Sequence, residues 1–182
     1  GDEPGHQVAI VRPGMVYGPL ALRHALLGLD VGRYHLQVGP ARRLPMIYVE
    51  HCAEALVLAA EAVIHRPGAV TAGPINLVDS DLPTCREFAD AIEPSGAPMA
   101  TAPVPWAAMR GLVAAIDGVN SSCFDGRAML PSVASKPEAH ARFKPLDYSN
   151  QRARDVLGWV PRSPWREAVA DSLAETCGPS AR

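Results

Sequence analysis

Lysine is nearly missing from this sequence: only Lys136 and Lys144 occur among 17 basic residues. With 19 acidic residues, the net charge is -2 and the isoelectric point is near 6.3. A chain with this charge lacks the basic surface that nucleic-acid binding requires. It also lacks an apolar run long enough to span a bilayer. We therefore expect no nucleic-acid partner and no membrane span.

Cysteine is scarce and scattered, at Cys52, Cys85, Cys123 and Cys177. None of the four belongs to a CxxC motif or to a cluster with histidine, which argues against a zinc site. Widely spaced cysteines in a chain of this size are typical of free thiols in a reducing compartment. The sequence thus predicts a cytoplasmic protein without a bound metal.

Three motifs of nucleotide chemistry are absent as well. The sequence contains no GxGxxG, no GxxGxxG and no Walker GxxxxGK[ST], the patterns whose bare backbone holds phosphate groups. No tyrosine is followed by a lysine four positions later, because those positions hold Ala21, Val38, Cys52 and Arg152. The chain does not begin with Met, and we expect it to be a fragment, a truncation or a processed form.

What is present fits a globular α/β protein. Hydrophobic residues make up 48% and charged residues 20% of the 182 positions, enough for one domain with a sizeable core. The apolar run Val8–Val11 predicts a strand buried on both faces of a parallel sheet, ended by Pro13. Further strands are expected at 34–38, 44–49, 74–78 and 99–104. Alternating strands and helices favour an α/β arrangement.

Helices are expected where apolar residues recur every three or four positions. These segments are 20–28, 50–65, 84–92, 106–119, 149–157 and the residues from 164 onward. Thr84 and Glu87 form a capping box at the start of one of them. In the 50–65 helix, Glu54 and Glu61 should share the exposed face while the other residues pack inward. Residues 121–142 show no period and predict a long loop, interpreted as a lid over a pocket.

Four segments follow one another in a fixed order. They read Arg-Pro-Gly-Met-Val-Tyr-Gly-Pro at 12–19, Ile-Tyr-Val-Glu-His-Cys-Ala-Glu-Ala at 47–55, Pro-Ile-Asn-Leu at 74–77 before Thr84 and Glu87, and Asp-Tyr-Ser at 147–149 before Leu-Gly-Trp at 157–159. Together they resemble the later half of the extended short-chain dehydrogenase/reductase superfamily, also called the NAD-dependent epimerase/dehydratase family. Each segment alone is weak evidence for this resemblance, whereas the order of all four is specific to the family.

The resemblance implies the C-terminal part of an NAD(P)-binding Rossmann-like fold that lacks the N-terminal cofactor βαβ units. Residues 1–182 would be a single partial domain, with the sheet strand and nicotinamide-side turn in 1–19 and mainly substrate-binding structure in 20–182. The family's glycine-rich turn and its catalytic Tyr-x-x-x-Lys lie upstream, so no catalytic residue is expected here. The cofactor would be NAD or NADP, and the missing N-terminal Rossmann half would be a partner.

Cofactor-facing residues are expected at Pro13, Gly14 and Val16. They match the family turn whose backbone touches the nicotinamide ring, and ligands bind at the carboxyl ends of strands in open α/β sheets. The alternative is that Pro13 and Gly14 only terminate a strand.

Substrate-side residues are expected at Met15, Tyr17 and Tyr48. Tyr17 matches the family's aromatic beside the substrate, although a half-buried anchoring hydroxyl is the alternative, and Tyr48 is equally suited to the core. Met15 and Leu44 stand where nucleotide-sugar enzymes of the family often have Asn and Arg. An apolar side chain cannot give a diphosphate charge-assisted bonds, although Arg42 and Arg43 are near enough in sequence to compensate.

These departures favour a small carbonyl or alcohol substrate, as in the reductase and hydroxysteroid-dehydrogenase-like branches. Two alternatives stay open: a non-catalytic binding or dimerisation module, and part of a nucleotide-sugar epimerase or dehydratase. A homodimer is compatible with all three. His51 replaces the family's usual Asp and is interpreted as a solvated residue at a helix start.

Overall fold

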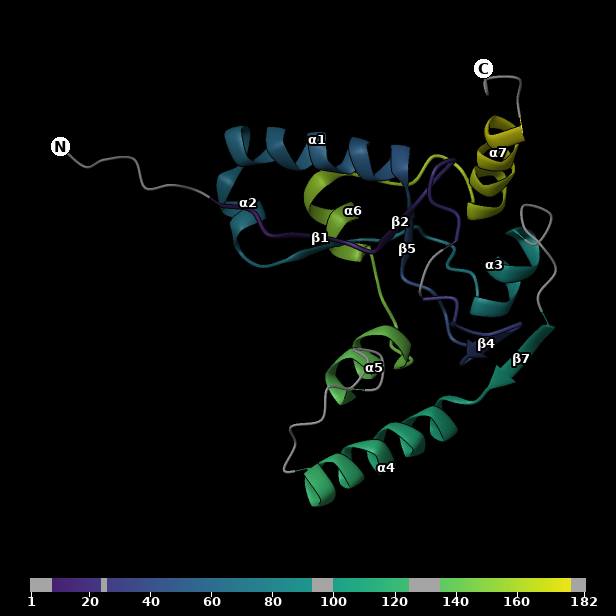
Figure 1. Cartoon of the computed structure of the whole chain (residues 1–182). Helices are drawn as coiled ribbons and strands as arrows, with labels where there is room; N and C mark the ends of the chain where they lie inside the picture. Colours follow the sequence, from purple (N-terminus) through teal and green to yellow (C-terminus); the bar gives the residue numbers. More distant parts are fainter. Residues whose placement is uncertain (1–7, 24–25, 93–99, 125–134, 178–182) are drawn as a thin grey trace. The chain divides into compact units, whose positions relative to one another are not determined.

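The structure is a computed structural model that describes residues 8–23, 26–92, 100–124 and 135–177. Two compact units share the chain, and each is assembled from separated segments (Figure 1). Unit 1 comprises residues 1–22, 44–83 and 147–182, and unit 2 comprises residues 23–43 and 84–146. The predicted division after residue 19 separates a cofactor-side segment from a substrate-binding segment. The two packing units do not test that division, so it stays a prediction.

Unit 1 contains short parallel strands with helices beside them. Its strands are β1 (Val11–Pro13), β2 (Met15–Tyr17), β5 (Met46–Tyr48) and β6 (Ile75–Leu77). Its helices are α1 (Val49–His65), α2 (Pro67–Thr71), α6 (Gln151–Leu157) and α7 (Trp165–Cys177). The expected strands at 44–49 and 74–78 and the expected helices at 50–65 and 149–157 are confirmed, with slightly different ends. Gly158, in the left-handed conformation with φ 69°, ends α6 as expected.

Residues 11–17 form one extended stretch that changes partner at Gly14. β1 pairs in parallel with β6, and β2 pairs in parallel with β5. The Gly14 N–H donates to the Leu77 carbonyl at 2.8 Å, whereas the Met15 N–H donates to the Pro45 carbonyl at 2.7 Å. The chain that follows β6 also bonds to β5, because the Asp79 N–H donates to the Met46 carbonyl at 2.8 Å. Strand β5 therefore begins to pair with this stretch at the point where β6 leaves it.

The first predicted strand is wrong in position and burial. The strand begins at Val11 and includes Pro13, not Val8–Val11, while Val8 and Ile10 are exposed. Ala9 and Val11 pack against the core from the other face. Thus one face of this segment is covered and the other is apolar and open. In the described part of the chain, no strand pairs with the second edge of β1.

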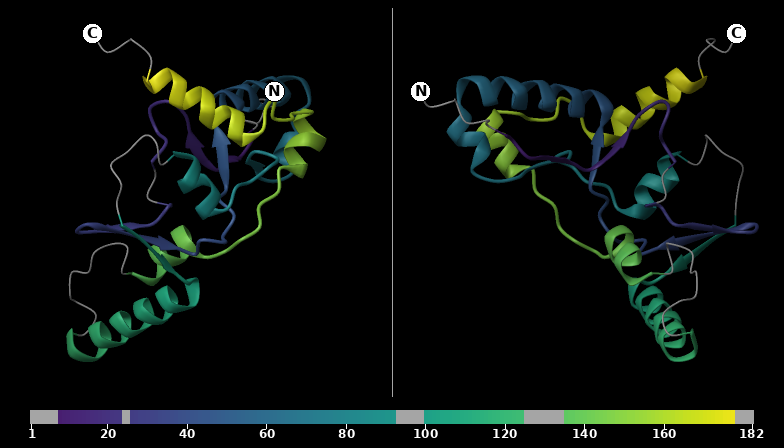
Figure 2. Two further views of the ribbon diagram at one scale, coloured as in Figure 1. Left: turned by 90° about the vertical axis from the view of Figure 1, so that its right-hand side faces the viewer. Right: turned by 60° about the vertical axis from the view of Figure 1, so that its left-hand side comes forward.

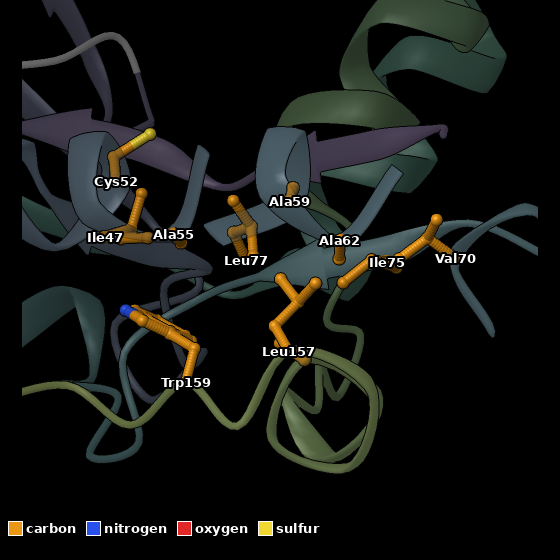
Figure 3. Packing of buried hydrophobic residues seen from close by; sticks show 11 residues of the cluster. Ile47, Cys52, Ala55, Ala59, Ala62, Val70, Ile75, Leu77, Leu157 and Trp159 are labelled. Carbon is orange, nitrogen blue, oxygen red and sulfur yellow. The ribbon is translucent and has the colours of Figure 1, made fainter. Parts of the chain in front are cut away.

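The core of unit 1 gathers where α1 and α6 meet β5 and β6 (Figure 3). Helix α1 contributes small side chains, which let its axis approach the strands closely. The buried members are Ile47, Cys52, Ala55, Ala59, Ala62, Val70, Ile75, Leu77, Ala153, Leu157 and Trp159. The expectation that all but the acidic face of this helix packs inward is wrong, since Val49, Leu56, Val57 and Ile64 are exposed.

Unit 2 is a three-stranded sheet with its own helices. Strand β4 (Tyr34–Val38) lies between antiparallel β3 (Leu29–Val31) and parallel β7 (Ala100–Val104). The helices are α3 (Cys85–Ile92), α4 (Trp106–Phe124) and α5 (Lys136–Phe143), and α4 packs against α5 (Figure 2). The capping box is confirmed: the Thr84 N–H donates to the Glu87 carboxylate at 2.8 Å, and the Glu87 N–H donates to Thr84 Oγ1 at 3.2 Å.

Two other expectations are wrong. Residues 20–23 and 26–28 are not helical; Leu20 is fully exposed, and the Ala21 N–H donates to the Gly18 carbonyl in a turn. The predicted loop 121–142 is helical at both ends, because α4 continues to Phe124 and α5 begins at Lys136. The interpretation as a lid falls mostly on residues 125–134, outside the described residues, as does the turn expected at 93–98.

Gly14 is required by packing, which gives a first prediction. A Cβ at this position would lie 2.5 Å from the Pro45 carbonyl oxygen and 3.0 Å from a Val78 methyl group. Gly14→Ala should therefore lower the free energy of unfolding by roughly 1–3 kcal/mol, the usual cost of overpacking. Gly111→Ala is the matched control, because nothing lies within 4 Å of its added Cβ. Urea unfolding measures both, and equal stability of the two variants would refute the packing argument.

Candidate functional site

A buried carboxylate joins the strand ends of unit 1. Asp79 is 3% exposed and has three hydrogen-bond partners. The Tyr17 hydroxyl donates to Oδ2 at 3.1 Å, the Tyr48 backbone N–H donates to Oδ2 at 3.2 Å, and His51 Nδ1 lies 2.8 Å from Oδ1. Within the described residues, no group of His, Cys, Asp and Glu side chains could hold a metal ion.

The fold explains why these residues meet. Tyr17 ends β2, Tyr48 ends β5, and Asp79 follows β6 by two residues. The carboxyl ends of parallel strands meet at one edge of a sheet, and His51 lies in the first turn of the helix that leaves β5. Asp79 also continues the sheet, since its N–H donates to the Met46 carbonyl at 2.8 Å. The cluster thus lies at the carboxyl ends of these parallel strands, which is where α/β proteins bind ligands.

Aromatic rings and a serine complete the cluster. The Tyr17 and Tyr48 ring centroids are 5.7 Å apart, and the Tyr48 and His51 rings meet edge to face at 5.4 Å. On the other side of His51, Ser163 Oγ lies 3.5 Å from Nε2. Ser163 stands just before α7, so the cluster connects the C-terminal helix to the strand ends.

Burial has the largest effect on the pKa values of the acidic groups in this cluster. It raises the pKa of the Asp79 carboxyl, although the hydrogen bond and charge of His51 and the Tyr17 hydroxyl act in the opposite direction. Burial also raises the pKa of the Tyr17 hydroxyl far above its usual range, and the neighbouring Asp79 charge raises it further. Tyr17 therefore keeps its proton at neutral pH and acts as a hydrogen-bond donor.

The structure brings two predicted substrate residues together. Tyr17 and Tyr48 are both buried, and the Tyr17 hydroxyl is engaged by Asp79. Met15, beside them on β2, is half-buried. Of the predicted cofactor residues, Pro13 is exposed at the end of β1, and Gly14 and Val16 are half-buried. The ligand-binding roles of all six stay predictions.

Sequence reasoning misjudged His51 and overlooked Asp79. His51 is 2% exposed and bound to Asp79, so the interpretation as a solvated histidine is wrong. The available signal was the pair itself: a histidine at a helix start and an aspartate just after a neighbouring parallel strand, both at carboxyl ends of the sheet. Ser163, expected only as a helix cap, likewise proves to be next to the histidine.

The argument based on Leu44 also changes. Leu44 is fully buried, so in this structure the side chain at that position belongs to the core. Arg42, named as a compensating cation, is buried in unit 2 and donates to the Leu26 carbonyl at 2.6 Å. Arg43 is exposed. Among the described departures from the nucleotide-sugar pattern, only Met15 remains near the strand ends.

The residues present do not make a complete dinucleotide site. The close approach of Gly14 to Pro45 and Val78 explains this glycine by packing alone. No glycine-rich phosphate turn occurs anywhere in the sequence, and a pyrophosphate needs such bare backbone at a helix start. The chain as given therefore lacks the phosphate-binding part of such a site.

Comparison with known proteins identifies the fold. No protein-family model and no curated protein sequence matches the chain. Solved structures do match. UDP-glucuronic acid 4-epimerase from Bacillus cereus, in complex with UDP-glucuronic acid and NAD, is 14% identical with a TM-score of 0.54, over 91% of this chain and 44% of that one. RMD from Pseudomonas aeruginosa, complexed with NADPH, is 11% identical with a TM-score of 0.53, over 94% and 49%.

The chain shares its α/β fold with part of these two solved structures. Pal from Bacillus thuringiensis is a third example, 16% identical with a TM-score of 0.51 over 91% of this chain. The chain spans less than half the length of these solved structures. The expected fold class, a partial Rossmann-like α/β fold, is confirmed. In the described residues, no helix is long and apolar enough to cross a membrane.

Tyr17 gives a second prediction, on pH. The pKa of Tyr17 in the folded protein is raised above the unfolded value near 10. The contribution of neutral Tyr17 to the free energy of unfolding is therefore fully present below pH 10. It is lost as the pH rises toward the folded pKa. Above pH 10 the wild type should lose up to about 1.4 kcal/mol per pH unit relative to Tyr17→Phe. Unfolding measured between pH 9 and 11.5 tests this, and a constant difference between the two proteins would contradict it.

Proposed function

We propose that this chain is the substrate-binding half of an NAD(P)-dependent oxidoreductase or epimerase. The parent would act on a small carbonyl or alcohol substrate, in the manner of the reductase and hydroxysteroid-dehydrogenase-like branches. The chain alone is catalytically incomplete, because it has neither the cofactor turn nor the Tyr-x-x-x-Lys pair. General acid–base catalysis by such a positioned pair contributes roughly 10²–10⁴-fold in rate.

One observation carries the proposal: unit 1 offers every surface that an added βα unit needs. Such a unit requires an unpaired strand edge, an apolar sheet face and an apolar helix flank. The second edge of β1 pairs with no described strand. Val8 and Ile10 leave the outer face of this segment apolar. Helix α1 supplies the flank.

The exposed flank of α1 has the spacing of a helix-packing face. Its large exposed residues are Val49, Leu56, Val57 and Ile64, with exposed Ala53 and Ala60 between them. These positions recur at three- and four-residue steps, so they form one stripe along the helix. In α/β folds, neighbouring parallel strands place their crossover helices side by side on one face of the sheet. A helix of the missing Rossmann half is therefore the proposed occupant.

Part of a nucleotide-sugar epimerase is the second candidate. It is favoured by the likeness to a UDP-glucuronic acid 4-epimerase and weakened by Met15, which cannot replace a hydrogen-bonding side chain. UDP-sugar binding separates the two candidates. If UDP-glucuronic acid raises the melting temperature of the completed protein while small apolar ketones do not, the nucleotide-sugar candidate replaces the first.

Cofactor binding gives the third prediction. NAD and NADP, titrated calorimetrically into the isolated chain, should show no binding with a dissociation constant below about 1 mM, an affinity of about 4 kcal/mol. After the chain is joined or mixed with a Rossmann half that carries the GxxGxxG turn and the Tyr-x-x-x-Lys pair, micromolar binding should appear. Binding by the chain alone would contradict the proposal. A reading frame without GxxGxxG and Tyr-x-x-x-Lys upstream would favour the non-catalytic module.

The exposed apolar face of the segment that leads into β1 gives the fourth prediction. Ile10→Glu should abolish co-purification with the Rossmann half, because it puts a charge into a face that becomes buried. Val31→Glu is the matched control: Val31 and Ile10 are both 54% exposed, but Val31 belongs to unit 2. Equal co-purification of both variants would refute this docking face. Sedimentation of each variant alone tests the homodimer, which remains a separate prediction.

A further inference from the structure

Ser163, His51 and Asp79 stand in the order nucleophile, base and orienting carboxylate. Ser163 Oγ lies 3.5 Å from His51 Nε2, and His51 Nδ1 lies 2.8 Å from Asp79 Oδ1. The two contacts use opposite nitrogens of one ring. This is the geometric relation that activates a hydroxyl nucleophile, and such contacts are often longer before a ligand binds. The three residues come from α1, the segment after β6 and the segment before α7.

The hydrogen bonds around Asp79 determine how the ring is protonated. The Tyr48 backbone N–H can only donate, and the Tyr17 hydroxyl keeps its proton, so both direct hydrogen atoms at the carboxylate. When Asp79 is ionised its carboxylate can only accept, and His51 Nδ1 then carries the hydrogen of that contact. In the neutral imidazole the lone pair is then on Nε2, which faces Ser163.

We propose that Ser163 is a reactive serine that takes an acyl or phosphonyl group from small activated electrophiles. Its oxygen forms a bond to the electrophilic carbon or phosphorus, and the hydroxyl proton moves to His51 Nε2. The bond to the leaving group breaks, and the leaving group departs with the bonding electron pair. Asp79 keeps the ring oriented and stabilises the imidazolium that forms. The site is distinct from the hydride chemistry proposed above and does not depend on it.

Burial distinguishes the nucleophile from the other two residues. His51 and Asp79 are buried, whereas Ser163 is half-buried. Of the three residues, Ser163 is therefore the one that a reagent in solvent reaches first. The base is screened from direct reaction, and Arg162, next to Ser163, is exposed and paired with Glu54. We expect stoichiometric labelling, because the three residues supply activation and no described residue is assigned to stabilise an oxyanion.

Labelling with a small alkyl fluorophosphonate tests the site. Mass spectrometry should locate one adduct on Ser163, formed with loss of fluoride. Ser163→Ala should remove the adduct, Ser149→Ala should leave it, and His51→Gln should slow its formation about 100-fold, the low end for a general base. No adduct on Ser163, or an equal rate in folded His51→Gln, overturns the proposal. Circular dichroism of each variant shows whether it is folded.

A thiol in place of the hydroxyl gives a test that leaves His51 in place. In Ser163→Cys the new thiol should be alkylated by iodoacetamide at pH 7 at least about tenfold faster than the exposed native Cys123, because a neighbouring imidazole favours the thiolate. Site-resolved mass spectrometry compares the two rates within one molecule. A rate equal to or below that of Cys123 overturns the proposal, whatever happens to His51→Gln.

Discussion

The arrangement of unit 1 depends on the buried Asp79 carboxylate. Taking a charge out of water costs several kcal/mol unless donors replace the lost hydration. Here the replacements come from three separate segments: the Tyr17 hydroxyl, the Tyr48 backbone and His51. Removing one partner of such a buried charge typically costs about 3–5 kcal/mol. The carboxylate therefore fixes how the ends of β2 and β5 and the start of α1 lie relative to one another, and with them every predicted substrate residue.

Local patterns in the sequence were sufficient where the structure is local. The helix at 50–65, the strand at 34–38 and the capping box of Thr84 and Glu87 depend on period and on contacts within a few residues, and all three are confirmed. The order of the four family segments gave the fold, confirmed by the solved structures. The helix expected at 20–28 is wrong although Leu22 and Leu27 are buried. The Ala21 N–H donates to the Gly18 carbonyl in a turn instead, and Leu20 is fully exposed.

The site was less accessible to sequence reasoning because its contacts are long-range. Tyr17 and Asp79 are 62 residues apart, and His51 and Ser163 are 112 apart. No periodicity connects such positions; only the topology of parallel strands does, by bringing their carboxyl ends to one edge. The burial of Val8–Val11 failed for a related reason. Its apolar pattern fits a strand covered on both faces, but the described residues cover only one.

At Gly14, packing and ligand binding would both require a residue without a side chain. A glycine in a turn at a strand end suits a cofactor that approaches bare backbone. In this chain the Pro45 carbonyl and the Val78 side chain already occupy the neighbourhood of the missing Cβ. The glycine is thus needed for β1 and β2 to change partners, even before any ligand is considered. Cofactor contact at this turn must therefore be judged from binding, and residues that packing does not explain, such as half-buried Met15, are the more informative markers of substrate.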